Sequence, residues 1–150
     1  MAETLTALPE QLISILQRET IVMLNTVDAD NGSPTVSAIS WIYPVDGGKL
    51  RFAIDQRSRI IANIQKTPIV SLSFFGGGTL NAVYGETTII AETLAEVPLK
   101  LACIEVNVTA VREAMFYGAR VSVDPEYVKT YDKRAADKLD GQVFDAIKKA

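Results

Sequence analysis

The chain has 150 residues, a length that suits one domain, and carries a net charge of −3 with 48% hydrophobic residues. Because acidic residues outnumber basic ones, we expect no general electrostatic attraction to DNA or RNA. The sequence contains no histidine, which excludes a Ser-His-Asp triad and any histidine-ligated metal or haem.

Cysteine usage and targeting signals indicate the compartment. Cys103 has no partner for an internal disulfide, which fits a reducing environment. Residues 1–8 lack the features of a signal peptide, and no apolar run approaches the roughly 20 residues of a membrane span. We therefore expect a cytoplasmic protein without a membrane partner.

Apolar residues recur with helical spacing near the start of the chain. Leu8, Leu12 and Leu16 form one stripe, which predicts a helix over about residues 9–18. Alternating or β-rich runs separated by turn residues follow and predict strands. The predicted strands cover residues 21–27, 35–45, 49–55, 69–75, 81–92 and 101–111.

The run 35–45 has apolar residues in both of its alternating sets, so we expect both faces of this strand to be covered. Asp46-Gly47-Gly48 predicts a hairpin into the next strand. Residues 58–66 change to a helical period. In the tail, helix-start signals predict helices over about residues 125–131 and 141–149.

Six or seven strands, connected mostly by hairpins, indicate a mainly β (α+β) fold with a closed or partly closed antiparallel barrel. A βαβ sandwich is disfavoured, because only one predicted helix lies between the central strands. We expect a single domain over residues 1–150, with the barrel over about 20–123 and the C-terminal helices over about 125–149.

The sharpest local feature is Asp55-Gln56-Arg57-Ser58-Arg59, where a predicted strand ends and a helix begins. Helix N-termini favour anions, and two arginines and a hydroxyl suit phosphate oxygens. The alternative is that Ser58 only caps the helix while Arg57 and Arg59 are solvated.

Other candidate features carry weaker signals. The serines within apolar strands either contact a flat polar ligand or simply face solvent; they are Ser37, Ser40, Ser71 and Ser73. Cys103 lies in an apolar strand, which is typical of a buried, inert thiol. The cationic and aromatic stretch 112–120 is either a partner-facing edge or part of a ligand rim.

The order of these features resembles the pyridoxamine 5′-phosphate oxidase-like family, the FMN-binding split-barrel group. The resemblance rests on Asn31-Gly32-Ser33-Pro34, Asp46-Gly47-Gly48, Arg57-Ser58-Arg59, Asn63 and the strand starting at Pro68, and it covers about residues 9–92. It implies a six-stranded antiparallel split β-barrel with short flanking helices, and a homodimer with FMN at the subunit interface.

The resemblance also implies roles for individual residues. Arg57, Ser58 and Arg59 match the stretch that holds the FMN phosphate, although the family commonly has lysine at the position of Arg59. Residues expected along the flavin ring, at the ribityl chain and at the ring edge are Ser37, Ala38 and Ile39, then Ile54 and Asp55, then Ser73. Phe116 or Tyr117 is expected to reach over from the second subunit.

The function implied is an FMN-dependent oxidoreductase that uses NAD(P)H or a small-molecule substrate, with no catalytic side chain and no metal assigned. Vitamin B6 oxidation is disfavoured, because nothing in the chain matches the pyridoxal-phosphate substrate site. The alternatives are a deazaflavin-using protein, an electron carrier without its own substrate, and a stress-related dimeric module that has lost its ligand.

Overall fold

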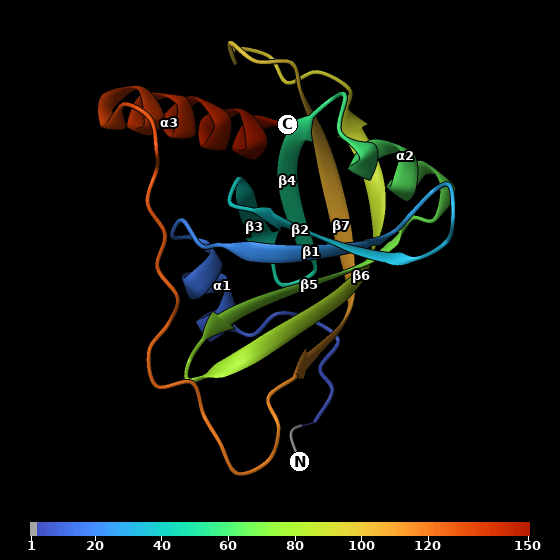
Figure 1. Cartoon of the computed structure of the whole chain (residues 1–150), viewed down its shortest axis with the longest axis vertical. Helices are drawn as coiled ribbons and strands as arrows, with labels where there is room; N and C mark the ends of the chain where they lie inside the picture. Colours follow the sequence, from blue (N-terminus) through green and yellow to red (C-terminus); the bar gives the residue numbers. More distant parts are fainter. Residues whose placement is uncertain (1–2) are drawn as a thin grey trace.

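The computed structural model describes residues 3–150 as one antiparallel sheet with three helices (Figure 1). The strands are β1 (Val22–Val27), β2 (Pro34–Ile39), β3 (Ile42–Asp46), β4 (Lys49–Asp55), β5 (Ile69–Gly76), β6 (Thr79–Ala91) and β7 (Leu101–Glu113). The helices are α1 (Glu10–Leu16), α2 (Arg59–Lys66) and α3 (Lys133–Lys149). The mainly β class is confirmed.

The sheet has seven strands in the order β2-β1-β5-β6-β7-β4-β3, which lies within the six or seven expected from the residues but differs from the six that the resemblance implies. The difference arises because the predicted strand 35–45 divides at Ser40 and Trp41. β2 pairs with β1, whereas the Trp41 carbonyl accepts a 2.9 Å bond from Ala53 N–H and directs β3 onto β4.

One continuous chain segment therefore supplies both edges of the sheet, β2 and β3. The sheet curls around its inner face without closing into a complete hydrogen-bonded barrel among residues 3–150. The two edge strands separate at the bend because each follows a different neighbour.

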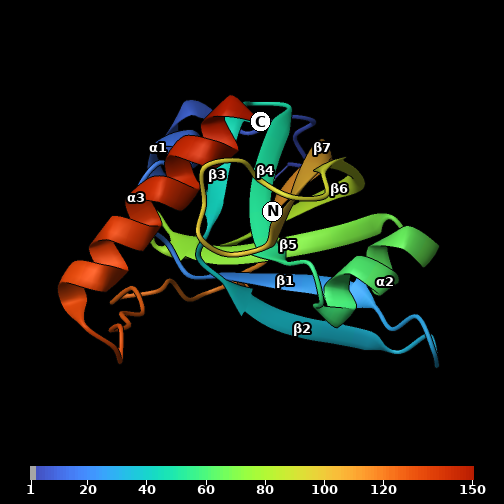
Figure 2. The ribbon, with the colours of Figure 1, turned by 90° about the horizontal axis from the view of Figure 1, so that it is seen from above.

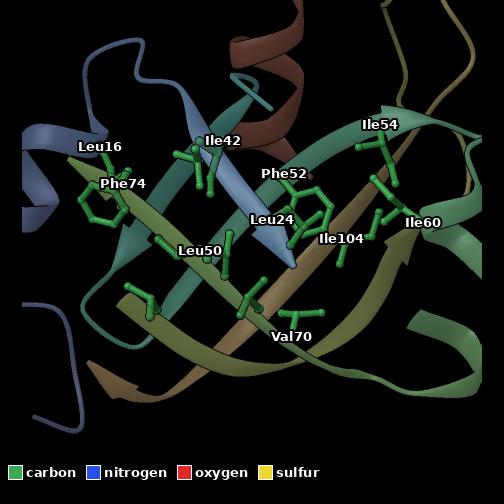
Figure 3. Close-up of a cluster of buried hydrophobic side chains, with 14 of the residues drawn as sticks. Leu16, Leu24, Ile42, Leu50, Phe52, Ile54, Ile60, Val70, Phe74 and Ile104 are labelled. Atoms are coloured by element: carbon green, nitrogen blue, oxygen red, sulfur yellow. The ribbon is translucent and has the colours of Figure 1, made fainter. Parts of the chain in front are cut away.

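The inner face of the curled sheet holds the main core. Figure 3 shows Leu16 of α1 beside Phe74 and Ile60 of α2 beside Ile54, so the two short helices cover opposite ends of this core. The most deeply buried large side chains include Phe52, Phe74, Leu24, Leu50, Leu72 and Ile104. Burial of each such side chain stabilises the fold by about 1.5–3 kcal/mol before entropy is counted.

Helix α3 forms a second core against the outer side of β3 and β4 (Figure 2). Ala53 and Cys103 face Val143, Ala146 and Ile147 there. No helix within residues 3–150 has the length and apolar character needed to cross a membrane.

The C-terminal helix prediction is wrong in its division. Residues 125–131 are not helical, and a single helix runs through Asp140 and Gly141. Asp132 is the N-cap of α3, because its carboxylate accepts a 2.9 Å bond from Ala135 N–H. Asp140 is instead buried against the sheet, where the Trp41 indole needs an acceptor.

Candidate functional site

The strand-to-helix corner after β4 is built by Ser58. Its Oγ accepts a 3.2 Å hydrogen bond from Ile60 N–H, and its own N–H bonds the Asp55 carbonyl at 2.9 Å. Ser58 is therefore the N-cap of α2, a role that stabilises a helix by about 1 kcal/mol. The cap role of Ser58 is confirmed, and the N-terminus of α2 lies at the surface, where Arg57 and Arg59 are both paired with carboxylates.

Arg57 lies back against the end of its own strand. Its Nη2 is 3.1 Å and its Nε 3.2 Å from the Asp55 carboxylate, whose Oδ1 also accepts the Arg57 N–H at 2.8 Å. These bonds hold the pKa of Asp55 below its usual value and raise the pKa of Arg57. The Arg57 side chain is 90% exposed, so this pair can open readily.

Arg59 points in a different direction, toward the turn between β1 and β2. Its Nη2 lies 2.9 Å from Asp28 Oδ2 and 3.1 Å from Asp30 Oδ2. The two carboxylates raise the pKa of Arg59. The pKa of Asp28 is lowered, first by the Asp30 N–H bond and then by Arg59.

The β1–β2 turn reaches Arg59 because α2 holds it in place. Asn63, on the buried side of α2, accepts the Ala29 N–H at 2.9 Å and donates to Thr26 Oγ1 at 3.0 Å. Lys66 Nζ donates to the Ala29 carbonyl at 2.9 Å. The turn, the strand ends and the helix therefore form one connected unit.

The sequence predicted no site role for Asp28, Asp30 or Lys66. Asn63 was part of the family resemblance, but no role was predicted for it. A signal existed for Asn63, because it shares the helical face of Ile60 and Ile64, where a polar residue implies a buried hydrogen bond. No local pattern could have paired Arg59 with carboxylates 31 and 29 residues away.

The corner has the donor chemistry of a phosphate site. Two exposed guanidinium groups flank the N-terminus of α2, and each can make charge-assisted bonds to phosphate oxygens. Three carboxylates face these two arginines, so any anion has to compete with them. Exposed ion pairs contribute only about 0–1 kcal/mol, so a phosphate can replace the carboxylates at little cost. The arginines therefore fit a phosphate site.

The residues expected along a flavin ring lie on both faces of the sheet. Directly paired residues of antiparallel strands share a face. Met23 pairs with Ala38 and Ser73, which places these two residues on the outer face with Met23 between them. Ser37 pairs with Leu24, which is 1% exposed, so its side chain faces inward.

Ile39 and Ile54 also point into the main core, and Ile54 is 7% exposed. The structure therefore brings Ala38 and Ser73 together on one face but separates them from the side chains of Ser37, Ile39 and Ile54. Because β2 is an edge strand, those of its backbone groups that point away from β1 have no strand partner among the described residues.

The outer face of β2, β1, β5 and β6 carries exposed apolar side chains. Val36 is 64% and Ile69 is 66% exposed on it, so the expectation that both faces of the 35–45 run are covered is wrong for β2. At its β7 end, Arg112 lies over the Tyr84 ring at 4.6 Å from the ring centroid.

The stretch 112–120 borders the outer face. Phe116 and Tyr117 are 70% and 102% exposed, and with Arg112 they line an open pocket of about 700 Å³.

Cys103 is fully buried, and burial raises the pKa of its thiol to about 11, so the thiol is protonated at neutral pH. Within residues 3–150, no three His, Cys, Asp or Glu side chains gather as a metal site.

Comparison with known protein families identifies the family of this chain. The sequence model described as pyridoxamine 5′-phosphate oxidase matches residues 8–132. The chain belongs to this family. The resemblance drawn from the sequence is thus confirmed, and the fold is the FMN-binding split barrel of the pyridoxamine 5′-phosphate oxidase family.

Solved structures agree with this assignment. An F420 reductase is 25% identical with a TM-score of 0.60, covering 70% of this chain and 98% of its own. General stress protein 26 from Bacillus anthracis is 17% identical with a TM-score of 0.57, covering 80% and 96%. An FMN-binding protein from Syntrophomonas wolfei subsp. wolfei is 16% identical with a TM-score of 0.51, covering 71% and 83%. No curated protein sequence matches the chain.

Proposed function

We propose that this family member binds FMN, with the cofactor phosphate at the corner of Arg57, Ser58 and Arg59. The observation that carries the proposal is the pair of exposed guanidinium groups at the N-terminus of α2. A phosphate dianion would accept charge-assisted hydrogen bonds from both arginines and gain from the helix N-terminus. The helix cap by Ser58 keeps these donors in position.

The remaining cofactor contacts follow from the same orientation. We place the flavin ring over Ala38 and the backbone of residues 37–39, with Ser73 at the ring edge. Ile54 and Asp55 lead from the sheet to the corner, and the ribityl chain would follow them. When bound, the flavin supplies the hydride or electron transfer, while the chain binds it, orients it and excludes water.

We further propose a homodimer with the flavin between the subunits. Support comes from the exposed Val36 and Ile69 on the outer sheet face, since a lone chain seldom leaves large apolar side chains grouped there. The exposed Phe116 and Tyr117 border the same face and would contact the second copy's flavin. This arrangement would exclude water from the ring.

The reaction we propose is a flavin-dependent oxidation or reduction with NAD(P)H or a small organic molecule as the partner. The absence of histidine supports this class, because flavin chemistry requires no histidine acid, base or metal ligand. A deazaflavin is the second candidate, favoured by the 25% identity to a structure named F420 reductase. A ligand-free stress module or an electron carrier is the non-enzymatic alternative.

The test is a flavin titration of the purified full chain. We expect FMN to bind at micromolar concentration or below, and Arg57→Ala or Arg59→Ala to weaken binding about tenfold or more, because each removes a charge-assisted phosphate contact. Riboflavin lacks the phosphate, so its affinity should not respond to either change. Arg134→Ala, an exposed arginine of α3, is the matched control.

Several outcomes discriminate among the candidates. Uptake of F420 in place of FMN would favour the deazaflavin reading, and flavin binding without NAD(P)H turnover would favour an electron carrier. Failure to bind either cofactor would overturn the proposal, as would FMN affinity that is indifferent to Arg57 and Arg59.

A further inference from the structure

The turn between β1 and β2 is braced by its own first residue. Asp28 N–H bonds the Ser33 carbonyl at 2.8 Å and Gly32 N–H bonds the Asp28 carbonyl at 2.9 Å. Asp28 Oδ1 also accepts the N–H groups of Asp30 at 2.8 Å and Asn31 at 3.1 Å. Gly32 has a φ of 74°, a value that favours glycine, so the turn has a defined shape.

This braced turn is docked onto α2 at Ala29. Its N–H donates to the 3%-exposed Asn63, and its carbonyl accepts from Lys66. Because both backbone groups of Ala29 are bound to the helix, the next residue, Asp30, is carried to a fixed place beside the start of that helix. The position of Asp30 near Arg59 therefore follows from the backbone, not from its own side chain.

The two acidic residues that face Arg59 differ in their structural roles. The Asp28 side chain is 12% exposed, and one of its oxygens is already used within the turn. The Asp30 side chain is 78% exposed and reaches Arg59 at 3.1 Å, but it accepts none of the bonds that shape the turn. Asp28 thus positions Arg59, while the Asp30 carboxylate only adds negative charge at the corner.

Resting on the proposed FMN site, we infer that Asp30 competes with the ligand phosphate for Arg59 and so sets the affinity and selectivity for phosphate-bearing ligands. Two arginines and three carboxylates meet at the corner before any ligand arrives. A dianionic phosphate that binds Arg59 Nη2 has to displace Asp30, and one that binds the other donors of Arg59 still lies near the Asp30 charge. A ligand without phosphate avoids both costs.

The test compares FMN and riboflavin binding to the full chain and to Asp30→Asn by flavin fluorescence titration. The substitution keeps the side-chain size and leaves the Asp30 N–H bond to Asp28 in place. We expect Asp30→Asn to bind FMN about two- to tenfold more tightly at low salt, the effect of one exposed ion pair and its repulsion. Riboflavin affinity should be unchanged, and about 0.5 M salt should reduce the FMN effect.

Asp145→Asn is the matched control, because it removes the same charge from an exposed site on α3. FMN binding by Asp30→Asn alone, with none by the parent chain, would also support the inference. Unchanged or weaker FMN binding by Asp30→Asn, beside measurable binding by the parent, would overturn the inference and leave the proposed function standing. If neither protein binds FMN, both are overturned.

Discussion

The indole Nε1 of Trp41 donates a 2.8 Å hydrogen bond to Asp140 Oδ1, joining the bend between β2 and β3 to the middle of α3. The other Asp140 oxygen lies 3.3 Å from Lys129 Nζ, which is 2.7 Å from Glu19. This network connects four parts of the chain: the connection between α1 and β1, the bend, the connecting segment 114–132 and α3.

Lys129→Ala should destabilise the protein through this network. The 8%-exposed Asp140 would lose its cation, and a mostly buried carboxylate without its partner costs about 1–3 kcal/mol. Urea unfolding followed by the fluorescence of Trp41, the single tryptophan, measures the loss and reports any change at the indole. Lys138→Ala, at an exposed lysine of α3, should change neither the stability nor the Trp41 fluorescence. An equal loss of stability in that variant would refute the role given to Lys129.

Two glycine-to-alanine changes should have opposite signs. A Cβ at Gly85, beside a β-bulge, would lie 2.5 Å from the Asn107 carbonyl oxygen, so Gly85→Ala should cost more than about 2 kcal/mol. A Cβ at Gly141 meets nothing within 4 Å, and Gly141→Ala should stabilise α3 by about 0.5–1 kcal/mol. Thermal denaturation of both variants measures the two effects. Melting temperatures that shift in the same direction would contradict this prediction.

Asp28 should contribute to the acid sensitivity of the fold. Its pKa is lower in the folded chain than its usual 3.8, because the turn N–H groups and Arg59 favour the carboxylate. A lowered pKa gives stability that is present above the unfolded value and is lost as pH falls through the folded value. Asp28→Asn should therefore be less stable than the parent at pH 7, with the gap closing as the pH falls below the usual pKa of 3.8 and through the lowered pKa of the folded chain.

Urea midpoints measured from pH 7 down to pH 2.5 test this expectation. A gap between parent and Asp28→Asn that stays constant with pH would mean that the carboxylate charge has no part in the effect. Asp137→Asn, exposed on α3, serves as the comparison.

Self-association should depend on the outer sheet face. The double change Val36→Glu and Ile69→Glu places charges on the two most exposed apolar residues of that face, so we expect a homodimer to dissociate to a 16.3 kDa monomer. Analytical ultracentrifugation measures this. Val123→Glu, at a 77%-exposed valine of the connecting segment, should leave the dimer intact. A parent chain that is monomeric at all concentrations would remove the basis for an interface flavin.

The sequence by itself determined the elements whose signals lie among neighbouring residues. The alternation of β4 predicted its bounds at residues 49–55, and burial of Leu50, Phe52 and Ile54 follows that alternation. The cap at Ser58 was equally local, because the hydroxyl and the N–H that it binds are two residues apart. Such contacts join residues that are close in the sequence, so periodicity and capping rules predict them.

Tertiary structure decided where the chain had to choose between distant partners. The run 35–45 divides because its halves pair with different strands, and Asp140 is buried in a helix because Trp41, 99 residues away, supplies its hydrogen bond. The face to which each of residues 37–39 points likewise follows from pairing with β1.

The same distinction applies to the phosphate corner. Its arginines and its cap follow from the sequence of residues 55–59, but the carboxylates that face Arg59 arrive from a turn about thirty residues earlier. Asn63 and Lys66 bring that turn to the helix. Local sequence therefore determined which groups can bind an anion, and long-range packing decided which charges compete with it.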